Sequence, residues 1–384
     1  MRRGTHRLLA QLGAAALALL SGCTQAPRPA PADAGVYWPT YMGDISRAPF
    51  LHQQISSAPP NVLWSRSVGP ALRGMPVVTD KVIVAASADR NVHALSRLDG
   101  STFWRKKLDG PPVSLLVIGD VIYAGTEGKG QLVTLDVIEG DNTWEYKLPS
   151  ISKPISLAGD TLYAATDDGS LFAIKPGAKE PIWRASFPRA ASAGPLVLDG
   201  WVVYVAYDSI FLLDRTNAER HAAAHSAEIF VGEAASDGEA LYLATELGSL
   251  VAWSVPDLEF LWQASGFGNF MAGPVLADSI GYATTRTGEL VRFDTRRGSA
   301  EIIGKASGTV LAPPTVVRNG VLLGTVGGRL HFFSRNGEPI WDVQLEGSIE
   351  LPVVIHEGRI VVSMYTRGKA RLGSGSRGKV VELR

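Results

Sequence analysis

The sequence predicts an all-β fold, an eight-bladed β-propeller of four-stranded antiparallel blades. Tryptophan recurs about every 40 residues, and where one is missing a whole repeat still fits. A tyrosine at the end of a short apolar run keeps the same period. Glycine and aspartate pairs separate the runs, as in β-hairpins, whose turns need the positive φ that glycine adopts at little cost. The periodic residues are Trp64, Trp104, Trp144, Trp183, Trp262 and Trp341, with Tyr123, Tyr163, Tyr204, Tyr242 and Tyr282.

Residues 1–22 have the features of an export signal. A start with three arginines precedes an apolar stretch, residues 8–20, which is too short and too rich in alanine for a membrane-spanning helix. The run Leu20-Ser21-Gly22-Cys23 resembles the lipobox of bacterial lipoproteins. We therefore expect cleavage before Cys23 and acylation of its thiol, with acyl chains that anchor the mature chain stably. The alternative is an ordinary secretory signal with a chance cysteine.

Residues 23–36 are expected to form a tether that begins at the lipidated Cys23. Thr24 stands where an aspartate would, in many two-membrane bacteria, retain a lipoprotein at the inner membrane. The periplasmic face of the outer membrane is therefore favoured. Gln25 to Gly35 is rich in proline and alanine, a composition typical of an extended, semi-rigid linker. The propeller is expected to occupy residues 37–384.

Each repeat has the same order of elements: a first strand, a Gly/Asp turn, an apolar strand ending in tyrosine, a glycine turn, a third strand and the tryptophan strand. The eighth repeat has no tryptophan strand of its own, and one spare strand, Asn61 to Arg66, precedes the first repeat. Pairing this strand with the blade that contains 360–364 and 380–383 would close the ring and remove two exposed strand edges. Each periodic tryptophan is expected to pack between neighbouring blades. First strands are expected at 74–78, 112–116, 153–157, 193–197, 232–235, 272–276, 312–316 and 350–354.

Composition excludes several classes of function. The chain has 37 Lys and Arg against 37 Asp and Glu, so no global field draws it onto nucleic acid. Cys23 is the single cysteine, which excludes an intramolecular disulfide and a cysteine-based zinc site. No mature segment approaches the eighteen or so consecutive apolar residues of a membrane-spanning helix.

The repeats are similar to those of the PQQ-type propeller family. Ala94 to Trp104, and Leu135-Asp136 with Trp144, keep parts of its repeat signature, and Trp38 to Asp44 resembles the segment that often opens such propellers. Lipobox, length and blade count resemble one branch, BamB, the lipoprotein subunit of the outer-membrane β-barrel assembly machine. That resemblance implies a propeller that binds the barrel-forming subunit through loops and holds no cofactor. The quinoprotein dehydrogenase branch holds pyrroloquinoline quinone with calcium, often under a vicinal disulfide, and this shorter chain has no cysteine pair.

Two loops depart from the BamB pattern. The resemblance implies a leucine-rich segment with arginine before one blade and closely spaced acids before the next. The corresponding stretches are Pro149 to Pro154 and Arg189 to Gly194, and neither carries the expected charges. Docking on the same partner through the same residues is therefore in doubt.

Other motifs are weaker candidates for chemistry. His221 and His225 have the spacing of a helical metal site, but an irregular outer loop is expected there. The glycine-rich runs 127–130 and 324–328 lie between strands, with no following helix to hold a phosphate, and are expected to be turns. Asp167-Asp168 is better explained by the hairpin turn at Asp168-Gly169 than by paired catalytic carboxylates. We expect no catalytic residue, no metal and no cofactor.

The last hairpin is the strongest charged feature. Residues 367–379 combine flexible Gly and Ser with five basic residues, which could contact anionic lipid headgroups or an acidic partner. A merely solvated loop is the alternative. The basic residues are Arg367, Lys369, Arg371, Arg377 and Lys379.

The sequence therefore predicts a non-catalytic, monomeric scaffold, anchored by lipid to the outer membrane and facing the periplasm, which binds a protein partner. Outer-membrane β-barrel assembly is the expected process, with a barrel-assembly subunit as partner. The alternatives are a periplasmic ligand-binding or sensing propeller and a quinone-dependent dehydrogenase.

Overall fold

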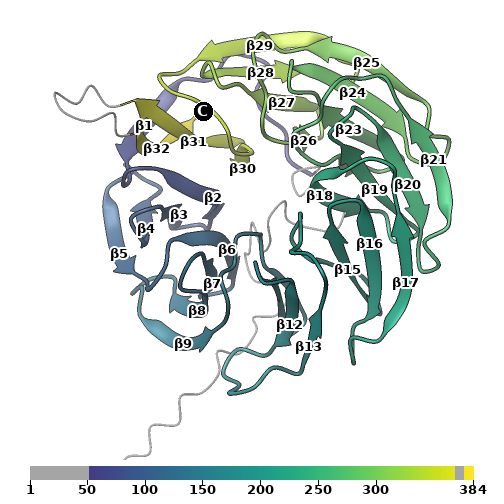
Figure 1. Cartoon of the computed structure of the whole chain (residues 1–384). Coiled ribbons are helices and arrows are strands. Elements are labelled where there is room, and N and C mark those ends of the chain that lie inside the picture. The colour runs from purple at the N-terminus through teal and green to yellow at the C-terminus, as the bar shows by residue number, and fades with distance from the viewer. Residues whose placement is uncertain (1–51, 368–375) are drawn as a thin grey trace, which may run out of the picture.

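A computed structural model describes residues 52–367 and 376–384 of the chain. The described part consists of eight four-stranded antiparallel sheets that stand around a central axis as the blades of a propeller (Figure 1). The predicted fold class and the number of blades are confirmed. Within these residues no helix is long and apolar enough to cross a membrane. The predicted signal peptide, Cys23 and the tether lie outside the described residues.

In blades 1 to 7 the chain runs from the innermost strand outward. Blade 1 contains β2 (Leu72–Val78), β3 (Val82–Ser87), β4 (Asn91–Ser96) and β5 (Thr102–Lys107). Blade 2 contains β6 (Pro112–Ile118), β7 (Val121–Thr126), β8 (Gln131–Asp136) and β9 (Asn142–Lys147). Blade 3 contains β10 (Ser156–Ala158), β11 (Thr161–Ala165), β12 (Ser170–Ile174) and β13 (Trp183–Ser186). Blade 4 contains β14 (Leu196–Val197), β15 (Trp201–Ala206), β16 (Ser209–Asp214) and β17 (Arg220–His225).

The second half of the ring repeats this order. Blade 5 contains β18 (Phe230–Ser236), β19 (Ala240–Thr245), β20 (Leu250–Ser254) and β21 (Phe260–Ala264). Blade 6 contains β22 (Val275–Ala277), β23 (Ile280–Thr284), β24 (Glu289–Asp294) and β25 (Ala300–Lys305). Blade 7 contains β26 (Thr315–Val317), β27 (Gly320–Gly324), β28 (Arg329–Phe333) and β29 (Pro339–Gln344). Blade 8 contains β30 (Val354–His356), β31 (Arg359–Arg367), β32 (Ser376–Leu383) and, outermost, β1 (Val62–Ser67).

The tyrosine and tryptophan markers share a period because they lie in one row across a blade. In blade 3, Tyr163 pairs with Ala173, which pairs with Trp183 on the next strand. The two rings lie 5.9 Å apart between centroids, across the small alanine. Across the sheet, large side chains thus flank a small one, and this uneven surface lets one blade pack closely against the next.

Several inner strands begin later than the sequence predicted. The strand expected at 153–157 is β10, which starts at Ser156, and the one expected at 193–197 is the two-residue β14. A proline stands just before each, Pro154 and Pro195. Proline has no backbone N–H to donate to the ladder, so regular pairing starts only after it.

The ring is closed by β1, as predicted. This strand pairs antiparallel with β32, from Val62 opposite Leu383 to Ser67 opposite Lys379. Beyond the strand ends, the N–H groups of Asn61 and Arg384 donate to each other's carbonyl oxygens at 2.8 and 2.9 Å. Blade 8 therefore gains its fourth strand from the start of the propeller, and both edges that an open ring would expose are paired.

A buried carboxylate reinforces this closure. Glu382 of β32 has no exposed surface. The indole N–H of Trp64 on β1 donates to its Oε2 at 2.8 Å, and the guanidinium of Arg359 lies 3.4 Å from the same oxygen. Arg97 of blade 1 approaches Oε1 to 3.8 Å. Residues of the closing strand, of blade 8 and of blade 1 therefore all approach the carboxylate of Glu382. The two guanidinium groups and the indole N–H compensate its buried negative charge.

Candidate functional site: the loop face

The six periodic tryptophans lie at the junctions between blades. In each case the indole N–H donates to a backbone carbonyl of the following blade or of the segment that completes it, at 2.8 to 3.4 Å. The ring of Trp104 also covers Gly140, where an added Cβ would lie only 2.6 Å from a ring carbon. The acceptors for Trp64, Trp104, Trp144, Trp183, Trp262 and Trp341 are Arg97, Val137, Ala178, Arg215, Thr295 and Ser56.

Ser56 is the exception that the ring closure explains. Blade 8 has no continuous turn before its outermost strand, because that strand comes from the other end of the propeller. The segment preceding β1 supplies the acceptor instead, at 3.0 Å from Trp341 Nε1. In the same segment, the side chain of Ile55 is buried, and the carbonyl oxygen of Ile55 accepts a hydrogen bond from Asn319 Nδ2 at 2.8 Å. Sequence reasoning missed this second part of the closure.

The two blades without a periodic tryptophan fill the position differently. In blade 4, Ala222, which pairs with Leu212, stands where the other blades have tryptophan. It packs against a cluster that contains Trp253 and Leu258 of blade 5. In blade 6, Ile303 packs into the core, and an added Cβ on Gly337 of blade 7 would lie 1.9 Å from the Ile303 carbonyl oxygen.

His221 and His225 do not lie in the irregular loop that was expected. They belong to β17, a regular outer strand, where a spacing of four residues corresponds to about 13 Å. The His221 ring packs against Trp201 at a tilt of 36° and lies 3.7 Å from Asp257, and His225 contacts the Ser209 hydroxyl at 3.0 Å. Among the described residues, no group of three or more His, Cys, Asp or Glu side chains could hold a metal ion.

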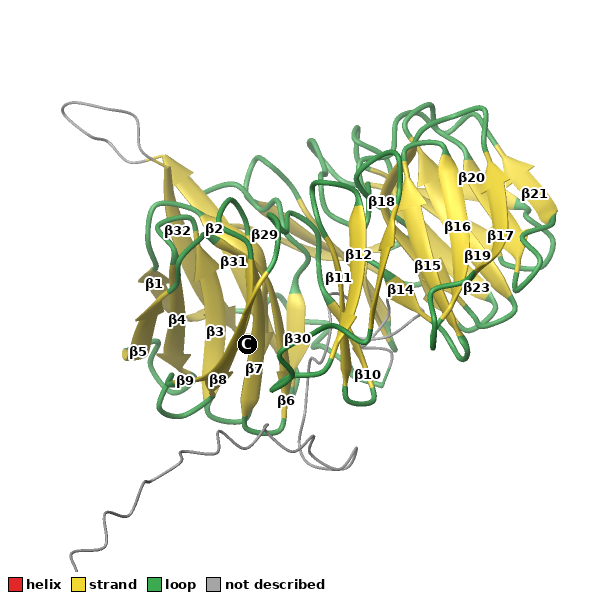
Figure 2. Ribbon diagram, turned by 60° about the horizontal axis from the view of Figure 1, so that its bottom comes forward, coloured by secondary structure: helices red, strands yellow, loops and turns green. Residues whose placement is uncertain are grey.

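Loops gather on two opposite faces of the propeller (Figure 2). Because strands alternate in direction, the connections between blades share one face with the turns between second and third strands. We call this the loop face. It carries both loops that depart from the BamB pattern, 149–154 and 189–194, and the end of β31 and the start of β32.

In the loop 149–154, two serines hold the carboxylate of Asp167 in place. Ser150 Oγ donates to Asp167 at 2.5 Å, and Ser152 also donates to this carboxylate. The neighbouring Asp168 accepts from the Thr166 hydroxyl at 2.6 Å and lies 3.5 Å from Arg184. The Thr166 hydrogen bond is the main reason that the pKa of Asp168 is lowered. The expected turn at Asp168-Gly169 is present, and both carboxylates serve local structure.

The second loop places a cation over an aromatic ring. The Arg189 guanidinium lies 4.9 Å from the ring centroid of Tyr207, which is 47% exposed in the turn between β15 and β16. Tyr207 has a φ of 55°, which a non-glycine residue rarely adopts. Tyrosine and arginine are, with tryptophan, the residue types enriched among the residues that contribute most to protein–protein binding. The only sequence signal was a tyrosine in a turn without glycine.

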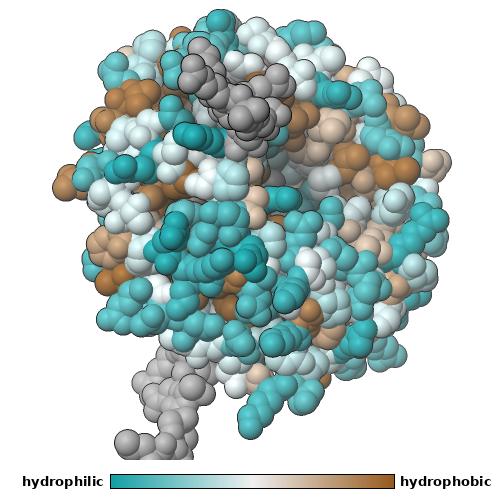
Figure 3. Space-filling model, turned by 60° about the vertical axis from the view of Figure 1, so that its left-hand side comes forward, coloured by the Kyte–Doolittle hydropathy of each residue, from teal (hydrophilic) through white to brown (hydrophobic). Residues whose placement is uncertain are grey.

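Exposed apolar residues continue along the loop face from this pair. Leu247 in the β19–β20 turn is 67% exposed, Met271 before β22 is 43% exposed and Val326 after β27 is 38% exposed. Among the described residues, the exposed large hydrophobic side chains in loops of this face all belong to blades 4 to 7. Figure 3 shows the side of the ring formed by blades 8, 1 and 2, where hydrophobic and hydrophilic residues are mixed. The sector of blades 4 to 7 on the loop face is therefore the best candidate for binding a protein.

The described residues include three of the five basic residues of the last hairpin. Arg367 ends β31, Arg377 is exposed on β32 and Lys379 is half-buried on the same strand. Lys369 and Arg371 lie outside the described residues.

This geometry defines a class of protein: closed eight-bladed propellers whose blades are docked through tryptophan. Within that class, the chain belongs to the family described as outer membrane protein assembly factor BamB. The family model matches residues 54–157, 148–265 and 248–384. A search of curated protein sequences finds no match.

Solved structures share the fold at low identity. BamB from Moraxella catarrhalis is 17% identical, with a TM-score of 0.67 over 85% of this chain and 100% of that one. The quinohemoprotein alcohol dehydrogenase from Comamonas testosteroni is 12% identical, with a TM-score of 0.69 over 90% of this chain and 80% of that one. A europium-containing methanol dehydrogenase is 12% identical, with a TM-score of 0.71 over 91% of this chain and 98% of that one. Identities this low show a common fold and no more.

Proposed function

We propose that the protein is a non-catalytic periplasmic scaffold, anchored to the outer membrane, that binds a protein partner during assembly of outer-membrane β-barrel proteins. The observation that carries this proposal is the family match, which extends through all eight blades. The first candidate for the partner is the barrel-forming subunit of the assembly machine.

The contacts are assigned to the loop face. Arg189, Tyr207 and Leu247 offer the cation, aromatic and apolar groups that are enriched at the centres of protein interfaces. The loops at 149–154 and 189–194 lack the charges that the family pattern has there, so the proposal assigns the contacts to Arg189 and to the neighbouring Tyr207 and Leu247 instead. The exposed Arg377 of the basic hairpin could add a contact to the partner or to lipid.

Anchoring is part of the same proposal. Residues 1–22 would be removed, Cys23 would carry the acyl chains, and residues 24–36 would hold the propeller at residues 37–384 off the membrane. A Cys23→Ser chain, exported with a non-lipoprotein signal, would then be released into the soluble periplasm.

A deletion strain tests the proposal. Loss of the protein should lower the amounts of folded β-barrel proteins in the outer membrane, and the unmodified chain should restore them. The soluble Cys23→Ser chain should restore them only in part, because it is not held beside the assembly machine. Unchanged barrel proteins in the deletion strain would contradict the proposal.

A further inference from the structure

Basic side chains line the loop face along the rim formed by blades 8, 1 and 2. They lie on or at the end of the neighbouring outer strands β5 and β9 (Figure 1), in the β3–β4 and β7–β8 turns, and at the start of β32. All of them are exposed. We call this set the basic rim: Arg90, Arg105, Lys107, Lys129, Lys147 and Arg377.

The two lysines that end the outer strands face uncharged partners. Lys107 pairs with Asn91, and Lys147 pairs with Gln131. In blade 6 the same position of the repeat is Lys305, which pairs with a glutamate of β24 and lies 2.6 Å from its carboxylate. Blades 1 and 2 therefore keep positive charges that blade 6 neutralises.

Few carboxylates offset the basic rim. Glu127 is already paired with Arg73 at 3.3 Å, and no ion pair among the described residues includes a member of the basic rim. Lys153 and Lys379, both half-buried, add to the positive charge. Positive charge is therefore in excess along this edge. The other acids on the loop-face side of blades 1 and 2 are Asp89, Asp109 and Glu145.

Backbone contacts hold these side chains next to one another. The N–H group after Lys107 donates to the carbonyl oxygen of Arg90 at 2.8 Å, and the N–H group after Lys147 donates to the residue that follows Lys129 at 3.1 Å. Between the two blades, an added Cβ on Gly110 would lie 2.8 Å from the carbonyl oxygen of Lys129. The connection from β1 to β2 shares two backbone hydrogen bonds with the start of β32, at 2.9 and 3.2 Å, and accepts one from the β3–β4 turn at 2.8 Å. The basic rim is therefore one continuous strip across three blades.

The opposite ends of the same blades are acidic. Their turns hold Lys81 and the buried Arg97 as basic residues, against a larger number of acids. Because the whole chain has 37 basic and 37 acidic residues, charge is separated between the two faces of these blades. A negatively charged surface would attract the basic rim and repel the other end. The acids are Asp80, Asp99, Asp120, Glu139, Asp141 and Glu357.

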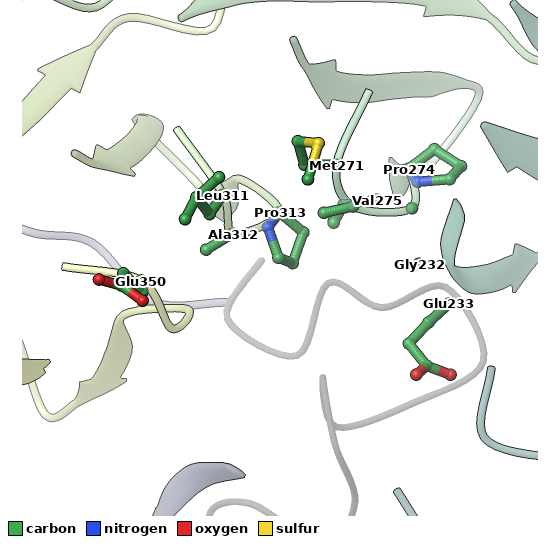
Figure 4. A pocket seen from close by; sticks show the side chains of 11 residues that line it. Gly232, Glu233, Met271, Pro274, Val275, Leu311, Ala312, Pro313 and Glu350 are labelled. Carbon is green, nitrogen blue, oxygen red and sulfur yellow. The ribbon is translucent and has the colours of Figure 1, made fainter. Parts of the chain in front are cut away.

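Near the axis, the loop face has a different character. A pocket there has Glu233 and Glu350 on opposite sides, with Met271, Leu311 and Pro313 between them (Figure 4). No lysine or arginine is among the described residues that line it. The basic rim therefore does not extend into this pocket and stays at the outer edge of blades 8, 1 and 2.

The composition of the basic rim fits a lipid surface better than a protein. Centres of protein interfaces are enriched in aromatic and apolar side chains and depleted in lysine. Half of the basic rim is lysine, and within the described residues no exposed large hydrophobic side chain lies in the loops beside it on this face. Clustered basic residues of this kind are attracted to the many phosphate groups of an anionic membrane.

We propose that the basic rim binds the phosphate groups of an anionic lipid bilayer. Beyond the proposed function, this contact gives the propeller an orientation. Blades 8, 1 and 2 lie toward the membrane, and blade 5, on the other side of the ring, lies away from it (Figure 1). The exposed Tyr207 and Leu247 then remain open to a protein partner. The contact is electrostatic and reversible, and it supplements the lipid anchor proposed at Cys23.

Co-sedimentation of the soluble mature chain with lipid vesicles tests the inference. The chain carries Cys23→Ser, so that no acyl group contributes. It should bind vesicles of phosphatidylglycerol and phosphatidylcholine in equal parts, but not vesicles of phosphatidylcholine alone. Binding should weaken as salt is raised. Lys107→Gln combined with Lys147→Gln should weaken it about 25-fold, since each basic residue near an anionic surface contributes about fivefold.

A matched control removes the same charge elsewhere. Lys81→Gln combined with Lys305→Gln replaces an exposed lysine of the opposite face and the paired lysine of blade 6, and should leave vesicle binding unchanged. Thermal melting followed by circular dichroism should show that both double variants fold like the unmodified chain.

Three results would overturn the inference: no binding to the anionic vesicles, equal binding to both kinds of vesicle, or an equal loss of binding in the two double variants. Absence of vesicle binding together with saturable binding of polyglutamate would assign the basic rim to an acidic protein instead. In each case, partner crosslinks from position 207 would leave the scaffold proposal standing.

Discussion

At the scale of single residues, each periodic tryptophan joins two blades through its ring and its N–H group. Trp183 is 8% exposed, and its indole donates to the Arg215 carbonyl at 2.9 Å. Trp183→Ala should lower the free energy of unfolding by about 3 to 5 kcal/mol, a large share of a typical total of roughly 5 to 15. Ile182→Ala, at its exposed neighbour, should change it by less than about 0.5 kcal/mol. Urea unfolding measures both, and equal losses would refute the docking role.

His356 makes the stability of the folded protein depend on pH. His356 at the end of β30 is fully buried, and burial together with the nearby Arg97 lowers its pKa to about 4. Between about pH 6.5 and 4 the unfolded chain therefore binds a proton that the folded chain does not, and stability falls as the pH falls. The loss across this window is up to about 3 kcal/mol. Above about pH 6.5 this histidine contributes no slope.

The comparison of His356→Gln with His221→Gln measures this effect. Stability of the unmodified protein, measured by urea unfolding at about pH 7 and pH 5, should fall more steeply than that of His356→Gln. His221 lies on the outer strand β17, and its replacement should keep the original slope. A slope that is the same in all three proteins would contradict the account.

At the scale of elements, the closing strand β1 contributes most to the integrity of the ring. It pairs with β32, and Trp64 on it donates to the buried Glu382. Deleting residues 61–67 should give insoluble or much less stable protein, because the outer edge of β32 and the buried carboxylate of Glu382 lose their partners. Deleting residues 25–34 should leave the melting temperature of the mature domain unchanged. If both truncated proteins melt like the full mature domain, the closure is unimportant.

The sequence predicted these elements well where a periodic residue marked them. Eight blades and a spare strand followed from the spacing of tryptophans and from Trp64 in particular. Inner strands were placed too early because Pro154 and Pro195 interrupt the ladder at positions that apolar patterning does not reveal. The Ser56 acceptor and the exposed Tyr207 were missed. Ser56 lies in a segment that contacts blade 7 only when the ring is closed, and Tyr207 lies in a turn that no periodic residue marks.

At the scale of the whole molecule, the propeller fold serves both binding proteins and quinone enzymes, as its structural neighbours show. The scaffold proposal predicts that calcium with pyrroloquinoline quinone leaves the melting temperature of the purified protein unchanged. A ligand that binds only the folded state must raise that temperature. A saturable rise together with dye-linked oxidation of an alcohol or sugar would reassign the protein as an enzyme.

The most direct test of the central claim is site-specific photocrosslinking in cells. A photoreactive amino acid at position 207 or 247, both exposed on the loop face, should trap a barrel-assembly protein that mass spectrometry then identifies. The same amino acid at position 98, which is 89% exposed in a turn on the opposite face, should trap none. Crosslinks from position 98 to the same protein, or no outer-membrane assembly protein from positions 207 and 247, would contradict the account.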